Sequence, residues 1–262
     1  MTVYLDLTRE FNVGRLRAVI CSGQAAVLHR LAIASKDGDW ILREDAEALE
    51  HVLGVLGRRG ARYRFGAPLD LRWLVGGWSA HFEFQHAGVR VRTDFMTRPP
   101  RVGAEDLARM WLELEGRDPP FTGARILAAM KKTDRQKDYP FIGELARKMP
   151  DPRDRLLFSR SAEDLIELAH EHPSLVSSLV AERPLLARIG ADRRALAEAL
   201  QLEMLDLIEE NARRIASYRA AMSNWEAVWP ALAGEVDSLS LREAHARIVE
   251  RAAGVLPERV TG

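Results

Sequence analysis

Short apolar runs and helical patterns alternate over the first hundred residues, and this alternation predicts a mixed region of strands and helices. Residues 17–21 form a mainly apolar run typical of a buried strand, and the run stops at Ser22-Gly23. Apolar positions recur with helical spacing over 24–30 and over 44–58. The second of these segments carries acids in its first turn and arginines in its last, as the helix dipole favours. Between the two predicted helices, residues 39–42 indicate another buried strand.

Strand patterns continue almost to residue 100. The runs 61–65 and 69–75 are apolar enough to predict two more strands. Residues 81–95 alternate with period two on either side of His86-Ala87-Gly88, which predicts a hairpin. The paired prolines Pro99-Pro100 suit neither a helix interior nor a central strand, so they mark a boundary.

Nearly all of the remaining chain has helical periodicity. Proline-containing breaks, the last of them at Pro230, separate segments in which helices are expected: 104–115, 121–131, 138–148, 161–170, 174–181, 192–217 and 240–253. The pattern predicts an α+β protein with a mixed sheet flanked by helices, followed by a mostly helical C-terminal domain. The expected domains are residues 1–102 and 103–262.

Composition narrows the functional classes. The 262 residues contain 38 Lys+Arg and 38 Asp+Glu, so an extensive nucleic-acid interface is not indicated, although a local basic patch remains open. The single Cys21 excludes an intrachain disulfide and a cysteine-based zinc site. The N-terminal MTVYLDLTREF does not resemble a signal peptide, and no apolar run approaches the ~20 residues of a membrane span. We therefore expect a cytoplasmic protein without a membrane partner.

Three acids are the candidate chemistry. In a strand, residues two apart share a face, so Asp37 and Asp39 project together if the strand includes both. Adjacent carboxylates repel one another, and a hard divalent cation such as Mg²⁺ relieves that repulsion. Asp94 ends the second strand of the predicted hairpin and would complete a two-metal site. The alternative is a surface Asp-Gly turn, because acids spaced two apart are common in this chain and recur at Glu113 and Glu115.

The order of these elements resembles the DNA polymerase β-like nucleotidyltransferase superfamily, in particular the small bacterial AbiEii-like and minimal nucleotidyltransferases. Ser22-Gly23 matches the glycine pair of that family, Asp37 and Asp39 match its Asp-x-Asp motif, and Asp94 matches its third acid. Gly38 departs from the large apolar residue usual between the two acids. The resemblance implies catalytic, metal-binding roles for the three acids with Mg²⁺ or Mn²⁺, and binding of a nucleoside triphosphate such as ATP at Ser22 and Gly23.

The resemblance extends to a segment of the second half. Arg135-Gln-Lys137-Asp138 is similar to a helical Arg-x-Lys-Asp segment of the family, and Lys132 and Arg135 are the expected phosphate contacts there. The alternative for these cations is a solvated helix end. The implied activity is transfer of a nucleotide from the triphosphate to an unidentified acceptor: a small molecule, a tRNA end or a protein hydroxyl. The alternative function is a non-catalytic interaction protein on the same fold, such as half of a toxin–antitoxin pair.

Overall fold

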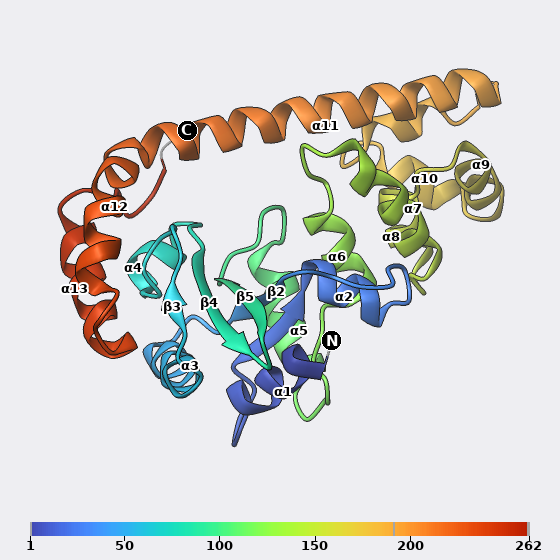
Figure 1. The fold of residues 1–262 in the computed structure, drawn as a ribbon. Helices are drawn as coiled ribbons and strands as arrows, with labels where there is room; N and C mark the ends of the chain where they lie inside the picture. The colour runs from blue at the N-terminus through green and yellow to red at the C-terminus, as the bar shows by residue number, and fades with distance from the viewer. Residues whose placement is uncertain (1, 191, 261–262) are drawn as a thin grey trace. The chain divides into compact units, whose positions relative to one another are not determined.

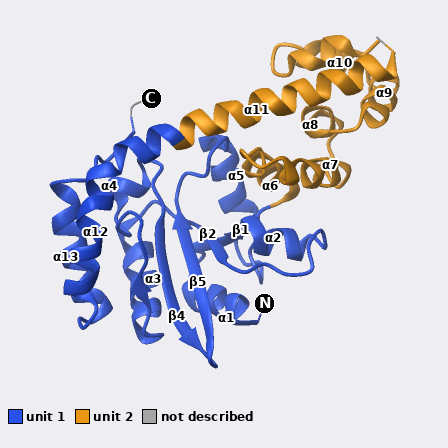
Figure 2. Ribbon diagram, turned by 45° about the horizontal axis from the view of Figure 1, so that its top comes forward, with its two compact units in different colours: residues 1–122, 216–262 blue, residues 123–215 orange. Residues whose placement is uncertain are grey.

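The computed structural model describes residues 2–190 and 192–260, and these form two compact units. Unit 1 combines residues 1–122 with 216–262, and unit 2 comprises residues 123–215 (Figure 2). The sequence predicted one boundary after residue 102, whereas the compact units divide after residues 122 and 215. The C-terminal segment belongs to the first unit because its apolar side chains share a core with that unit, as described below.

Unit 1 is built around a mixed five-stranded sheet in the order β1-β2-β5-β4-β3 (Figure 1). The strands are β1 (Ala18–Cys21), β2 (Gly38–Leu42), β3 (Arg62–Tyr63), β4 (Ala80–His86) and β5 (Val89–Met96). Strands β2 and β5 are parallel, and the other neighbouring pairs are antiparallel. A mixed sheet with flanking helices, followed by a mostly helical region, confirms the predicted fold class. The predicted hairpin is present as β4 and β5.

One face of the sheet carries the main core. Trp40, Phe82 and Phe95 are fully buried on this face, and the Trp40 and Phe95 rings stack with centroids 5.4 Å apart. Helices α1 (Thr2–Phe11) and α3 (Ala46–Arg58) lie on this side of the sheet (Figure 1). Helix α1 was not predicted from the sequence. Its Phe11 packs edge-on against both stacked rings, with centroids 5.3 and 5.7 Å away.

A second core lies beyond β3, where segments from both ends of the chain meet. It contains the buried Trp73, Trp78 and Trp225, whose indole N–H groups donate to backbone carbonyls of Leu256, Pro257 and Gly66, respectively. The helices around it are α4 (Leu71–Leu74), α12 (Ser223–Val236) and α13 (Leu241–Ala253) (Figure 1). These long-range contacts tie the C-terminal segment to unit 1.

Two local predictions in this region were wrong. Residues 69–75 are not a strand, because the Asp70 carboxylate accepts from the Arg72 N–H and starts the short helix α4 there. Pro230 does not end a helix but lies inside α12. Pro230 is exposed while Trp225 and Leu232 are buried, so the packing of the apolar side maintains the helix despite the missing N–H donor.

The other helices agree with the predicted segments to within a few residues, except for α8 and η2, which were not predicted. Unit 1 also contains α2 (Ser22–Leu28) and α5 (Ala104–Glu113). Unit 2 contains α6 (Ala124–Met130), η1 (Gln136–Asp138), α7 (Tyr139–Arg147), α8 (Pro152–Phe158), α9 (Ala162–Glu171), α10 (Pro173–Leu179), η2 (Pro184–Arg188) and most of α11 (Arg193–Ala221). None of the described helices combines the length and apolarity that crossing a membrane requires.

Candidate active site

The sheet register brings the predicted acids together on the face opposite the main core. Asp39 on β2 and Asp94 on β5 are direct partners in the parallel pair, so their strands lie about 4.8 Å apart at this point. Asp37 immediately precedes β2, two residues before Asp39, and therefore projects to the same side. The element order expected from the resemblance is present: β1, Ser22-Gly23 at the start of α2, then β2, α3 and, later, β5.

Basic side chains contact Asp37 and Asp94. Arg64 Nη1 donates to Asp94 Oδ1 over 3.2 Å. His81 Nδ1 lies 2.8 Å from the same oxygen, although the approach is not aligned as a hydrogen bond. Arg92 Nη1 lies 3.9 Å from Asp37 Oδ1, which is an ion pair beyond hydrogen-bond range. The acids therefore belong to a mixed cluster of charges.

Strand pairing explains how these basic groups reach the acids. Across β4 and β5, His81 faces Asp94 and Glu83 faces Arg92, so the four side chains occupy one face of the hairpin. Arg64 follows β3, where its backbone N–H donates to the His81 carbonyl, and its Nε lies 3.9 Å from Glu83. The site thus extends over β2, β5, β4 and the end of β3.

The donor set suits a hard divalent cation, since Mg²⁺ and Mn²⁺ both accept carboxylate oxygens. Asp37 Oδ1 is inaccessible to solvent and has no hydrogen-bond partner, which is unusual for a charged oxygen and leaves it available to a cation. Within residues 2–190 and 192–260, however, no three His, Cys, Asp or Glu side chains are grouped closely enough to hold a metal. Arg64 contacts Asp94, and Arg92 contacts Asp37. A divalent cation therefore fits this site if it displaces the two arginines from these carboxylates.

Two aromatic rings pack against Gly38 on the core side of β2. A Cβ atom at this position would lie 2.4 Å from the Trp40 ring and 2.6 Å from the Tyr4 ring. The Tyr4 hydroxyl donates to the Lys36 carbonyl over 2.7 Å, which anchors the backbone that carries Asp37. Burial raises the pKa of Tyr4, and the negative charge of Asp37 raises it further. The glycine is therefore explained by packing, because it admits a tyrosine from α1 to the edge of the site.

The resemblance implies that a triphosphate binds at Ser22 and Gly23, whereas in the structure Ser35 from the loop before β2 lies against Gly23. Ser22 has φ +50°, the left-handed region, at the turn from β1 into α2. A Cβ atom on Gly23 would lie 2.2 Å from Ser35 Oγ, so the glycine provides room for the loop before β2. The buried Gln24 amide reaches the Ser35 and Asp37 carbonyls, each over 3.3 Å, and ties that loop to α2. Phosphate binding by Ser22 and Gly23 stays a prediction.

Lys132 and Arg135 belong to unit 2, where both make contacts within the unit. Lys132 Nζ lies 4.6 Å above the centroid of the Phe158 ring. Arg135 pairs over 2.7 Å with Asp138, a buried carboxylate that also receives the Thr133 hydroxyl. The basic segment is thus ordered around one buried acid, and phosphate contact by Lys132 and Arg135 also stays a prediction.

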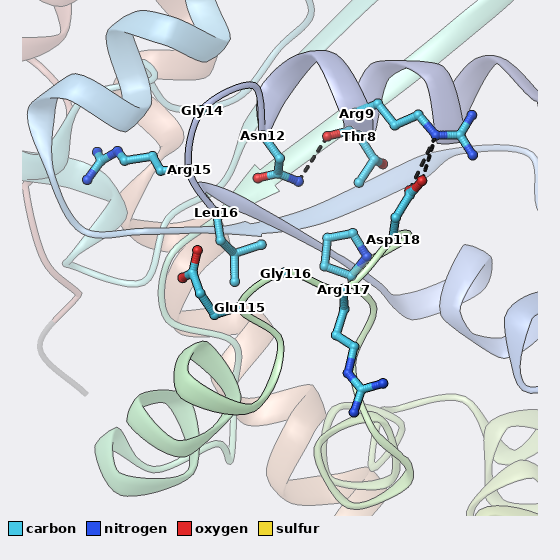
Figure 3. A pocket seen from close by; sticks show the side chains of 11 residues that line it. Thr8, Arg9, Asn12, Gly14, Arg15, Leu16, Glu115, Gly116, Arg117 and Asp118 are labelled. Carbon is cyan, nitrogen blue, oxygen red and sulfur yellow. Dashed lines mark hydrogen bonds and ion pairs between the residues drawn. The ribbon is translucent and has the colours of Figure 1, made fainter.

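A pocket of about 330 Å³ lies in another part of unit 1, between the end of α1 and the loop after α5 (Figure 3). Its polar groups already serve the fold. Asn12 donates to the carbonyls of Thr8 and Ala18, and Arg9 pairs with Asp118 over 3.2 Å. None of the three candidate acids lines this pocket. We therefore place the candidate site at the acids and not at this pocket.

Four residues of the site were not predicted as functional. The period-two alternation of 89–95 contained the signal for Arg92, because residues two apart share a strand face and Arg92 must then lie on the side of Asp94. His81 begins the predicted hairpin, where a histidine does not by itself indicate a functional role. Tyr4 and Arg64 carry no local signal, since only tertiary packing brings α1 and the end of β3 to the acids.

Neither a protein-family model nor a curated protein matches the chain. Among solved structures, the chain is similar to a crystal structure described as a "putative nucleotidyltransferase from H. pylori". The two chains are 13% identical, with a TM-score of 0.39, and the similarity covers 81% of this chain and 96% of the other. Similarity at this level does not define an activity, so the functional conclusion depends on the geometry of the acids.

Proposed function

We propose that the chain is a metal-dependent nucleotidyltransferase that moves a nucleotide from a nucleoside triphosphate to an acceptor. One observation carries the proposal: Asp39 and Asp94 are direct partners on parallel strands, and Asp37 precedes Asp39 on the same face. Three carboxylates on one face of two neighbouring strands are costly without a counter-charge, and Mg²⁺ or Mn²⁺ would supply it. The acceptor class stays open among small molecules, a tRNA end and a protein hydroxyl.

Each group has a defined part in the proposed reaction. Asp37, Asp39 and Asp94 would hold the cation, which would polarise the phosphate oxygens. An acceptor oxygen forms a bond to the α-phosphorus while the bond from that phosphorus to the bridging oxygen of the β-phosphate breaks, so pyrophosphate leaves in line. The acceptor's proton passes to a carboxylate of the site. Ser22 and Gly23 are the proposed contacts to the nucleotide in unit 1.

The test compares Asp37→Asn with Glu113→Gln. Glu113 is an exposed acid of α5 in the second acid-x-acid pair of the chain, so its variant controls for loss of one negative charge. We expect Asp37→Asn to weaken Mg²⁺-dependent nucleotide binding at least tenfold, or about 1.4 kcal/mol, and to reduce transfer of label from an α-labelled triphosphate. Glu113→Gln should match the wild type in both assays. Equal binding by Asp37→Asn and wild type would refute the assignment.

A second function is favoured by the charge pairing itself. Arg64 and Arg92 contact Asp94 and Asp37, and no metal-binding group is preformed among the described residues. An interaction protein on this sheet would keep such ion pairs as part of its structure. If the chain is an interaction protein, calorimetry with Mn²⁺ and a triphosphate should show no binding. If it is a nucleotidyltransferase, the same titration should show saturable binding.

A further inference from the structure

We infer that Arg64 and Arg92 form an anion subsite for the phosphate chain of the nucleotide. The inference rests on the proposed function and deepens it, because it assigns the polyphosphate to the sheet face that carries the acids. Both guanidinium groups contact the acids, but neither arginine is among the residues expected to bind the metal or the nucleotide. Both side chains are also reachable from solvent, with exposed fractions of 30% for Arg64 and 35% for Arg92.

The two contacts differ in strength, and both can be exchanged. Arg92 and Asp37 are 3.9 Å apart and share no hydrogen bond, so this pair lacks the directional contact that fixes a structural ion pair. Arg64 makes one hydrogen bond of 3.2 Å to Asp94 and lies 3.9 Å from Glu83. Neither arginine makes the two parallel hydrogen bonds of a bidentate carboxylate pair among its described contacts.

The chemistry favours an exchange of partners when substrate arrives. While the acids are negatively charged, they attract the arginines and repel a triphosphate. A divalent cation bound to the acids weakens their attraction for the arginines and their repulsion of a triphosphate. The guanidinium groups can then pair with the phosphate oxygens. Arginine's planar fork matches a phosphate bidentately, which the present contacts to Asp37 and Asp94 do not use.

The placement of the arginines fits a chain-like ligand. Arg92 lies two residues before Asp94 on β5, and Arg64 reaches the same acid from beyond β4, at the end of β3. The two cations therefore approach the acids from different strands. A polyphosphate bound at the acids would be long enough to meet guanidinium groups from both strands, whereas a single phosphate group would reach fewer of them.

The experiment uses the full chain with Arg92→Gln and Arg64→Gln, and with Arg90→Gln as the matched control. Arg90 is exposed and lies on the same face of β5, two residues further from Asp94. Calorimetry measures Mn²⁺ alone, then a non-hydrolysable nucleoside triphosphate and the matching monophosphate in the presence of Mn²⁺. Circular dichroism verifies that each variant is folded.

We expect changes of opposite sign. Mn²⁺ affinity should be unchanged or raised in Arg92→Gln and Arg64→Gln, because a competing cation has been removed. Triphosphate affinity should fall at least tenfold, with a smaller loss for the monophosphate, and Arg90→Gln should resemble wild type. Arg92→Lys keeps the charge but not the fork, so it should restore part of the triphosphate affinity. If the arginines only formed structural ion pairs, their replacement would not raise the Mn²⁺ affinity while lowering the triphosphate affinity.

The failures are distinguishable. Wild-type protein that binds neither Mn²⁺ nor triphosphate would overturn the proposed function and this subsite with it. Saturable binding by the wild type, together with undiminished triphosphate binding by folded Arg92→Gln and Arg64→Gln, would overturn the subsite alone. Parallel loss of Mn²⁺ and triphosphate affinity would also overturn it, since the arginines would then support the acids and not the phosphates.

Discussion

Replacing Gly38 with alanine should destabilise unit 1, even though most Gly→Ala changes outside the left-handed region are stabilising. The added Cβ would lie 2.4 and 2.7 Å from two atoms of the Trp40 ring and 2.6 Å from Tyr4 Cδ1. Trp40 is fully buried, stacks on Phe95, and donates its indole N–H to the Thr8 hydroxyl over 2.9 Å. Neither ring can move away without losing packing or a hydrogen bond.

The magnitude follows from two opposing effects. Forcing one extra methyl group into a packed core costs about 1–3 kcal/mol. Lower entropy of the unfolded chain offsets about 0.4–1 kcal/mol of that cost. The net loss for Gly38→Ala should therefore be about 1–2 kcal/mol. Because Gly38 lies between Asp37 and Asp39, the shift of the strand should also weaken any metal binding by the acids.

Tryptophan fluorescence during urea unfolding measures this loss in unit 1 alone. All six tryptophans of the chain fall in residues 1–122 or 216–262, so the signal is independent of unit 2. Gly54→Ala is the matched control: it lies inside α3, where the nearest atom to a new Cβ is the end of Arg58, 3.8 Å away. That variant should gain about 0.5–1 kcal/mol. Gly38→Ala with the stability of wild type, or higher, would refute the packing explanation.

Three further predictions concern other parts of the molecule. Glu203→Gln should destabilise unit 2 by about 3 kcal/mol, because the buried Arg183 loses its carboxylate, and faster hydrogen exchange around α8 and η2 would report it. Burial lowers the pKa of His245, so its contribution to stability is complete above pH 6.5 and is lost as pH falls below that value. His245→Gln should flatten the decline of the urea midpoint between pH 6.5 and 5, and an unchanged slope would contradict this assignment. Tyr4→Phe removes the hydrogen bond to Lys36 and should cost about 1 kcal/mol, with faster amide exchange over residues 35–39; unaltered exchange would exclude the anchoring role.

Part of the grouping of the candidate acids was predictable from sequence, because it depends on local strand alternation. Strand alternation fixes which residues share a face, so Asp37 with Asp39, and Arg92 with Asp94, follow from spacing of two alone. That β2 and β5 are neighbours does not follow from local pattern and was supplied by the family resemblance. The structure pairs them in the register that sets Asp39 beside Asp94.

The parts that sequence did not predict depend on contacts between distant segments. Nothing local in residues 223–236 indicates that Trp225 packs with Trp73, and this packing returns the C-terminal helices to unit 1. Residues 69–75 have strand-like apolarity, but one capping carboxylate, Asp70, is enough to start a helical turn. A cap interaction of about 1 kcal/mol decides between two conformations that the apolar pattern does not distinguish.

The same contacts also bear on the alternative that Asp37 belongs to a solvated surface turn. A solvated Asp-Gly turn would leave both carboxylate oxygens in water, where they need no protein partner. Instead, the Tyr4 ring packs over Gly38, Gln24 ties down the Asp37 carbonyl, and Asp37 Oδ1 is withdrawn from solvent without a hydrogen bond. Burying a charged oxygen in this way is unfavourable unless a cation approaches it. Arg92, at 3.9 Å, supplies only part of that compensation, and a cation at the proposed metal site would supply the rest.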